Sequence, residues 1–91
     1  MSSRADTILR LARASKESSD GIVRHLYRDA LEREAMTRAV DVVRADAARG
    51  VRHTHSSALQ IYAGGMRDLA SHYRRRLKLD GESYYNALEH L

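Results

Sequence analysis

With 91 residues, a net charge of +4 and no cysteine, the chain has room for one domain and excludes a disulfide framework or a thiolate metal site. Phe and Trp are absent, so five Tyr, three Met and the aliphatic residues must form a small core, to which a partner or a second copy could add burial. No apolar run approaches the roughly 20 residues that span a bilayer, so we expect a soluble, cytoplasmic protein without a membrane partner.

The composition favours helices throughout. Proline is absent, and the stretches between the five glycines are rich in Ala, Leu, Arg and Glu, which hold a helical backbone at little cost. Turn residues occur at 18–21, at Gly50 and at Asp80-Gly81. These features predict a single all-α domain over residues 1–91, with helices over about residues 4–17, 21–49, 54–79 and 82–90.

The first two expected helices are amphipathic. Ser3 is placed to cap the first, with Asp6 completing a capping box. The apolar stripe of the second widens near its start, which suggests contact with two neighbours. One face of the first helix holds Ala5, Ile8, Leu11, Ala12 and Ser15. The stripe of the second holds Ile22, Leu26, Met36, Val40, Val43 and Ala47, and widens to take in Val23, Tyr27, Ala30 and Leu31.

Acid-to-arginine pairs at i,i+4 lie along the first two expected helices. They give a structural reason for most of the N-terminal arginines. Each such pair stabilises a helix by about 0.2–0.5 kcal/mol. The pairs are Asp6–Arg10, Asp20–Arg24, Asp29–Arg33 and Glu34–Arg38.

The third expected helix contains Gly64-Gly65, which would mark either a turn or a glycine patch inside one helix. The apolar stripe keeps one helical phase across the glycines, which favours one helix. Each glycine costs about 1 kcal/mol relative to alanine, and close approach of another backbone or a ligand is the usual compensation. The stripe consists of Leu59, Tyr62, Met66, Leu69, Tyr73 and Leu77.

The last expected helix places apolar residues on one side and is interpreted as a docking helix. Adjacent Tyr84 and Tyr85 cannot both face inward, so one should be exposed, as in an interaction hot spot. Tyr84, Tyr85, Leu88 and Leu91 are therefore the candidate protein interface.

A short link over residues 50–53 allows the second and third helices only to turn back on one another. The predicted architecture is a small helical bundle, built on a long antiparallel helix hairpin of about 40 Å with a short helix at each end.

Charge is the main functional clue. Residues 49–78 carry seven Lys or Arg against one acid, Asp68, whereas residues 1–48 balance nine against eight and residues 79–91 hold three acids and no base. A local positive field attracts an anionic partner more readily than scattered charge.

On the third helix, cations line the face that points away from the apolar stripe. Arg67, Ser71, Arg74 and Lys78 share this face, and Arg52, His53 and His55 could lengthen it. Arginine and lysine neutralise phosphates and release counterions. Two alternatives to anion binding stay open. The face could simply be solvated, and Arg75 and Arg76 could form intramolecular ion pairs with Asp29 and Glu32. The predicted anion-binding residues are Arg52, Arg67, Arg74, Arg75 and Lys78.

Other chemistries find weak support. A helix-turn-helix needs a sharp turn, yet the apolar phase continues through Gly64-Gly65. His53-x-His55 lacks further ligands at metal-site spacing. Ser56-Ser57 beside His55 lacks a group that would orient the histidine, and no phosphate-cradling glycine loop is present. We therefore expect no enzyme activity, no metal, no cofactor and no small-molecule substrate.

The sequence predicts a non-enzymatic helical binding protein whose basic face, within residues 49–78, engages an anionic partner, most readily nucleic acid or a nucleic-acid-containing complex. The alternative is a protein–protein interaction module. Such a module could be a dimeric adaptor, or a small inhibitor of the kind that phages and other mobile elements carry, which binds and blocks a larger macromolecular machine. An arginine face also fits an acidic protein surface, so charge alone does not separate the two.

Overall fold

The computed structural model describes the backbone of residues 3–89 and the side chains of residues 3–78. The regular structure of this part consists of three α-helices: α1 (Arg4–Glu17), α2 (Gly21–Ala48) and α3 (His55–Glu89). The all-α prediction is confirmed, and the first two helices have nearly the predicted bounds.

The starts of α1 and α2 are fixed by side-chain caps. At α1, the Ser3 hydroxyl accepts from the Asp6 N–H at 3.1 Å while Asp6 Oδ2 accepts from the Ser3 N–H at 3.4 Å, so the predicted capping box is confirmed. At α2, Asp20 Oδ1 accepts from the Ile22 N–H at 2.9 Å. Both carboxylates therefore bind backbone donors at a helix N-terminus, where the helix dipole also favours negative charge.

Ion pairs one turn apart stabilise the middle of α2. The predicted pairs Asp29–Arg33 and Glu34–Arg38 are present, with N···O distances of 3.1 and 3.5 Å. The two pairs support α2 locally, because each joins side chains one turn apart on the same helix. Glu34 also pairs with Arg4 of α1 at 3.7 Å and so links α1 to α2.

α3 is a single continuous helix. The prediction that Gly64-Gly65 lies inside one helix is confirmed. The predicted turn at Asp80-Gly81, and with it a separate helix over 82–90, is wrong, because the α-helical backbone continues to Glu89. One glycine costs a helix only about 1 kcal/mol, and because no proline is present nothing forces the helix to end at Gly81.

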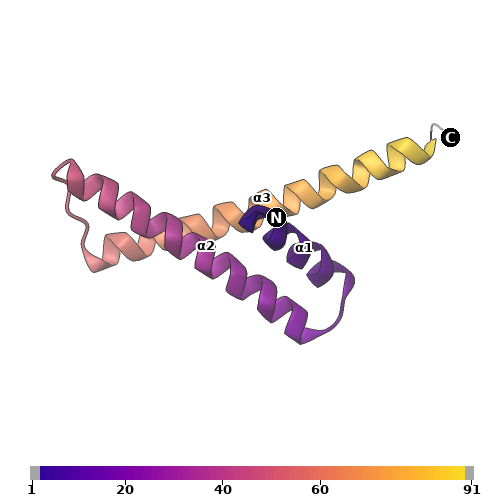
Figure 1. The fold of residues 1–91 in the computed structure, drawn as a ribbon, viewed down its shortest axis with the longest axis horizontal. Coiled ribbons are helices and arrows are strands. Elements are labelled where there is room, and N and C mark those ends of the chain that lie inside the picture. Colours follow the sequence, from indigo (N-terminus) through magenta and orange to yellow (C-terminus); the bar gives the residue numbers. More distant parts are fainter. Residues whose placement is uncertain (1–2, 90–91) are drawn as a thin grey trace.

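The three helices are arranged around a crossing. α2 and α3 are joined by residues 49–54 and run in opposite directions, and in Figure 1 the middle of α2 crosses the first half of α3. α1 lies in the angle that opens between the first part of α2 and the later part of α3, and it contacts both. Among the described residues, this arrangement places the core that the three helices share beyond the crossing.

The core is small and receives two residues from each helix. All six are less than 5% exposed, and among them Leu69 is the largest fully buried side chain. The core residues are Ile8 and Ala12 of α1, Leu31 and Ala35 of α2, and Leu69 and Tyr73 of α3.

The apolar stripe predicted for α2 is largely solvent-exposed. Ile22, Leu26, Met36 and Val40 are 69, 49, 52 and 37% exposed. The buried α2 residues are Leu31, which the widened start of the stripe includes, and Ala35 and Ala39, which the stripe does not include. Small residues meet at this contact: a Cβ built on Gly65 would lie 3.9 Å from the Ala35 Cβ, an ordinary van der Waals distance. Small residues let the two backbones approach, and this packing turns the larger aliphatic side chains outward.

The molecule is elongated for its length. Its radius of gyration is 16.7 Å and its extents are 58 × 30 × 26 Å, whereas a compact chain of this size has a radius of gyration of about 12 Å. In Figure 1 the last part of α3 projects beyond α1 and α2. Much of the helical surface therefore stays available to solvent or a partner.

The connection between α2 and α3 is closed by a polar clamp. Gly50 adopts φ +87°, which an L side chain rarely tolerates. Beside it, Asp46 accepts hydrogen bonds from His53 Nε2 at 2.6 Å and from the Arg49 guanidinium, and His53 Nδ1 lies 3.1 Å from the Ser57 hydroxyl. The clamp ties the end of α2 to the start of α3.

Acid is expected to weaken this clamp. The hydrogen bond from His53, with a second from Arg49, lowers the pKa of Asp46 below its ordinary value. A lowered folded-state pKa stabilises the protein above the unfolded pKa, about 3.9 for Asp, and this stabilisation is lost as pH falls through the folded value. Thermal unfolding followed from pH 7 to about pH 2 should therefore show a smaller loss of Tm below pH 4 in Asp46→Asn, which starts from a lower Tm, than in the unaltered protein. Parallel curves would contradict this role of Asp46.

Replacing Gly64 with alanine is expected to stabilise the protein. A Cβ at this position would meet nothing within 4 Å, and the backbone is already helical. The gain should be about 1 kcal/mol in the free energy of unfolding, measured by urea denaturation, because alanine loses less conformational entropy than glycine in a helix. Gly50→Ala is the control: its positive φ predicts destabilisation by the same assay.

Candidate anion-binding face

Cations line the side of α3 that faces away from the core. Arg67, Arg74 and Lys78 are exposed. Arg67 and Lys78 lie opposite buried Leu69 and Tyr73 on the helix, and Arg74 lies at the edge of this side, where it also lines a pocket between the helices. At 1.5 Å per residue the row from Arg67 to Lys78 is about 16 Å long, or about five base-pair steps of B-DNA. We call Arg67, Arg74 and Lys78 the basic row.

These cations have no carboxylate partner among the described side chains. Within residues 3–78, no ion pair involves Arg67, Arg74, Arg75 or Lys78. The acids that sequence analysis placed opposite Arg75 are engaged elsewhere: Asp29 pairs with Arg33, and Glu32 with Arg28 at 3.2 Å. The charges of the basic row are therefore available to an external anion.

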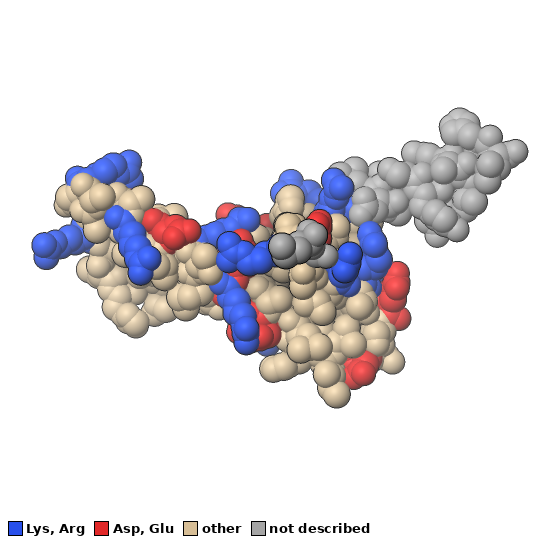
Figure 2. All heavy atoms as spheres, viewed as in Figure 1, with Lys and Arg blue, Asp and Glu red and all other residues tan. Residues whose placement is uncertain are grey.

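Arg52, in the α2–α3 connection, is also exposed. His53, considered as an extension of the face, is instead held by Asp46 and Ser57. His55 lies at the rim of an apolar groove. In Figure 2, Lys and Arg side chains gather at the end of the molecule that contains this connection, and again where α1 meets α3.

Asp46, His53 and Ser57 form a hydrogen-bonded series of the kind found in hydrolases. The Ser57 hydroxyl donates to the Thr54 carbonyl at 3.1 Å, and the Ser57 N–H donates to the Thr54 hydroxyl at 3.1 Å. Since the hydroxyl proton is engaged by the helix start, the arrangement serves as a loop clamp. We assign no reaction to it.

An open pocket lies beside Arg74, at the junction of the three helices. Its volume is about 500 Å³, and its lining includes Lys16 of α1 and Tyr27 of α2. Sequence analysis assigned Tyr27 to packing and gave Lys16 no role. No local signal could have joined them to Arg74, because they come from three different helices.

A second concavity is apolar and lies between α2 and α3 near their connection. Its volume is about 280 Å³, and Met36, Val40 and Leu59, exposed by 52, 37 and 50%, form part of its wall. Ala39, Val43, His55, Ala58 and Tyr62 complete the lining. Residues that were expected in the core thus form the wall of an apolar groove.

The predicted protein interface lies outside the described side chains. Tyr84, Tyr85, Leu88 and Leu91 all belong to residues 79–91. The sequence prediction for these four residues stays a prediction.

No protein-family model matches the chain, and no curated protein or solved structure matches it either. In the described part of the chain, no helix has a stretch long and apolar enough to cross a membrane, and no three potential metal ligands come together. Function is therefore inferred from charge and geometry.

Proposed function

We propose that the protein is a non-enzymatic binder of nucleic acid, or of a nucleic-acid-containing complex, and that it acts through the basic face of its α2–α3 hairpin. The single observation that carries the proposal is the basic row, whose cations are exposed, in line and without carboxylate partners among residues 3–78. Arg52 and Arg75 extend the charge around it.

Such a face suits the nucleic-acid backbone better than base edges. Phosphate contacts need only positive charge at suitable spacing, whereas base readout needs side chains that reach into a groove. Between Arg67 and Arg74 the outward face carries Ser71, which is short and lets a backbone approach closely. We therefore propose binding with little base selectivity.

Fluorescence-anisotropy titration of two unrelated duplexes, a single strand and an RNA, repeated from 50 to 200 mM salt, tests this function. If five cations contact phosphates, log K should fall with log salt at a slope of about −4.5 on duplex DNA, which corresponds to a loss of about 500-fold over this range. The two duplexes should bind with similar affinity. Absence of binding to every probe at 50 mM salt would overturn the proposal.

The apolar groove favours a second candidate, a protein–protein interaction module. Met36, Val40 and Leu59 offer exposed apolar surface on two helices, and such a groove can receive the apolar face of a partner helix. This function predicts a partner whose binding is weakened by Leu59→Arg and little affected by salt. Weak salt dependence would therefore distinguish binding of a protein partner in the apolar groove from binding of nucleic acid by the basic row.

A further inference from the structure

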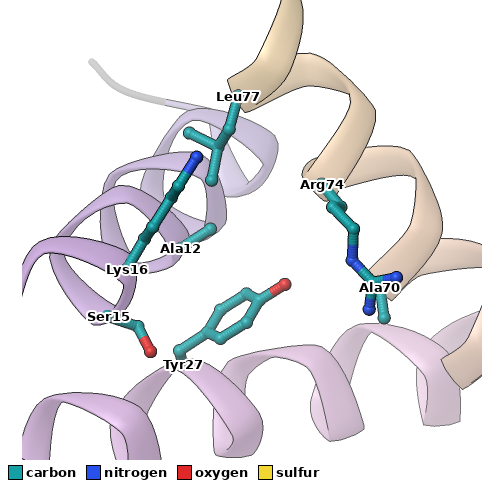
Figure 3. Close-up of a pocket in the computed structure, with 7 residues that line it drawn as sticks. All are labelled: Ala12, Ser15, Lys16, Tyr27, Ala70, Arg74 and Leu77. Carbon is teal, nitrogen blue, oxygen red and sulfur yellow. The ribbon is translucent and has the colours of Figure 1, made fainter. Parts of the chain in front are cut away.

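The pocket at the three-helix junction combines cations with apolar walls. Figure 3 shows Lys16 and Arg74 on opposite sides of the pocket, with Lys16 extending toward Leu77 and the Tyr27 hydroxyl pointing toward Arg74. Ser15 adds a second hydroxyl to the lining. The described lining residues are Ala12, Ser15, Lys16, Tyr27, Ala70, Arg74 and Leu77.

The charge of the pocket favours an anion. Lys16 and Arg74 come from α1 and α3 and bring two positive charges to one concave site, and no carboxylate is present among the described lining residues. Both side chains are exposed, and their positive potentials add over one concave, partly apolar wall. The site should therefore bind anionic ligands in preference to neutral ones of similar shape.

The hydroxyl of Tyr27 supplies a neutral donor. Burial raises the pKa of Tyr27 above its ordinary value of 10.0, although the nearby Arg74 opposes the shift. The phenol thus keeps its proton at neutral pH and can donate it to an anionic oxygen. With Ser15, two hydroxyl-bearing residues and two cations line the same pocket.

The number of donors fits a phosphate better than a carboxylate. A phosphate monoester carries nearly two negative charges at neutral pH and three strong acceptor oxygens, whereas a carboxylate has one charge and two oxygens. Arginine adds a planar fork of donors that suits phosphate geometry.

The remaining walls leave room for the group that carries the phosphate. The volume of about 500 Å³ falls within the range of small-molecule sites, roughly 300–1,000 Å³. Ala12, Ala70 and Leu77 are apolar, and the Tyr27 ring offers a flat face on which a base can stack. The pocket therefore suits a flat, partly apolar group next to the anion.

We propose that the three-helix pocket binds a phosphate monoester carried by a nucleoside, with Lys16 and Arg74 flanking the phosphate and the Tyr27 hydroxyl donating to it. This ligand site goes beyond the backbone binding proposed above, with which it shares only Arg74. No reaction is assigned to the ligand. The same chemistry could come from a free nucleotide or from the terminal phosphate of a nucleic-acid strand.

Isothermal titration of the full chain with adenosine 5′-monophosphate, adenosine and benzoate tests the site. The monophosphate should bind, and adenosine and benzoate should bind at least about tenfold more weakly, because a charge-assisted hydrogen bond contributes about 1.5–3 kcal/mol. Equal binding of the monophosphate and adenosine, or binding of neither, would overturn the proposal, as would equal binding of benzoate.

Variants assign the binding to this pocket. Lys16→Gln and Tyr27→Phe should each weaken binding of the monophosphate, and Lys16→Gln should raise its Kd by about tenfold or more. Arg67→Gln, which removes an equal charge from the basic row outside the pocket, should leave it unchanged. Unaltered binding in Lys16→Gln, with helicity by circular dichroism equal to that of the original chain, would show that the monophosphate binds elsewhere.

Oligonucleotides separate the two sources of phosphate. A single strand with a 5′-phosphate that binds more tightly than its 5′-hydroxyl counterpart, by a margin lost in Lys16→Gln, would identify a strand end as the source. Equal binding of the two strands, together with binding of the monophosphate, would identify a free nucleotide. Both results support the phosphate site.

The same variants keep this site distinct from backbone binding. Lys16→Gln should leave the affinity for a blunt duplex without terminal phosphates largely intact, whereas Arg67→Gln should reduce it. Failure of the pocket would then appear in the monophosphate titration alone, and failure of the basic row in the duplex titration alone.

Discussion

Replacing Arg67, Arg74 and Lys78 together with alanine is expected to reduce the affinity for duplex DNA by about two orders of magnitude at 0.1 M salt. Each lost phosphate contact removes about 0.9 from the salt slope, so the slope should change from about −4.5 to about −2. All three side chains are exposed, so the substitutions should leave the core intact. Anisotropy titration at four salt concentrations measures both the affinity and the slope.

A triple variant of equal charge provides the control. Arg10, Arg24 and Arg44 are exposed cations on α1 and α2, outside the basic row. Their replacement with alanine lowers the net charge by the same amount and should change the slope by less than about one unit. Equal losses in the two triple variants would mean that overall charge attracts the nucleic acid, and the basic row would then not be the binding face.

Leu69→Ala is expected to destabilise the fold by about 2–5 kcal/mol in the free energy of unfolding. The side chain is 1% exposed and is the largest fully buried residue of the core. Truncation removes buried apolar surface and leaves a cavity between three helices, which a rigid helix junction fills only partly. A chain of this length has about 5–14 kcal/mol of stability in total, so the variant should lose a large share of it and unfold at a clearly lower urea concentration.

The matched control for this substitution is Leu59→Ala. Both leucines lie on α3, but Leu59 is 50% exposed. Its truncation should cost about 1 kcal/mol or less, measured by urea denaturation and far-UV circular dichroism. Similar costs at the two positions would show that the core is centred nearer to the α2–α3 connection than the structure places it.

Local interactions made a large part of the fold predictable. The capping box at Ser3 and Asp6 depends on residues three apart, and the continuity of α3 through Gly64-Gly65 depends on one helical phase. At Asp80-Gly81, Leu77, Tyr84 and Leu88 are spaced by seven and four residues, so the apolar helical spacing also crosses this pair. Turn propensity alone therefore predicts a turn where the helix continues.

Packing between helices was less predictable. The sequence offers α2 two apolar sides, and the larger aliphatic residues pointed to the stripe with Ile22, Leu26, Met36 and Val40. The structure buries Ala35 and Ala39 instead, and Ala35 packs where α3 presents Gly65. Side-chain size thus worked against the prediction: small residues gave the closer contact and left the large ones to form a groove.

The sequence by itself determined the helical class, the caps and the row of cations on one side of α3, since each depends on residues within a few turns of one helix. The tertiary structure alone decided which side of α2 is buried, why Asp46 holds His53, and how Lys16, Tyr27 and Arg74 come to share one pocket. Helical periodicity fixes the direction of a side chain around its own axis. It does not fix which neighbouring helix that side chain meets, because this depends on the closest approach that the backbones can reach.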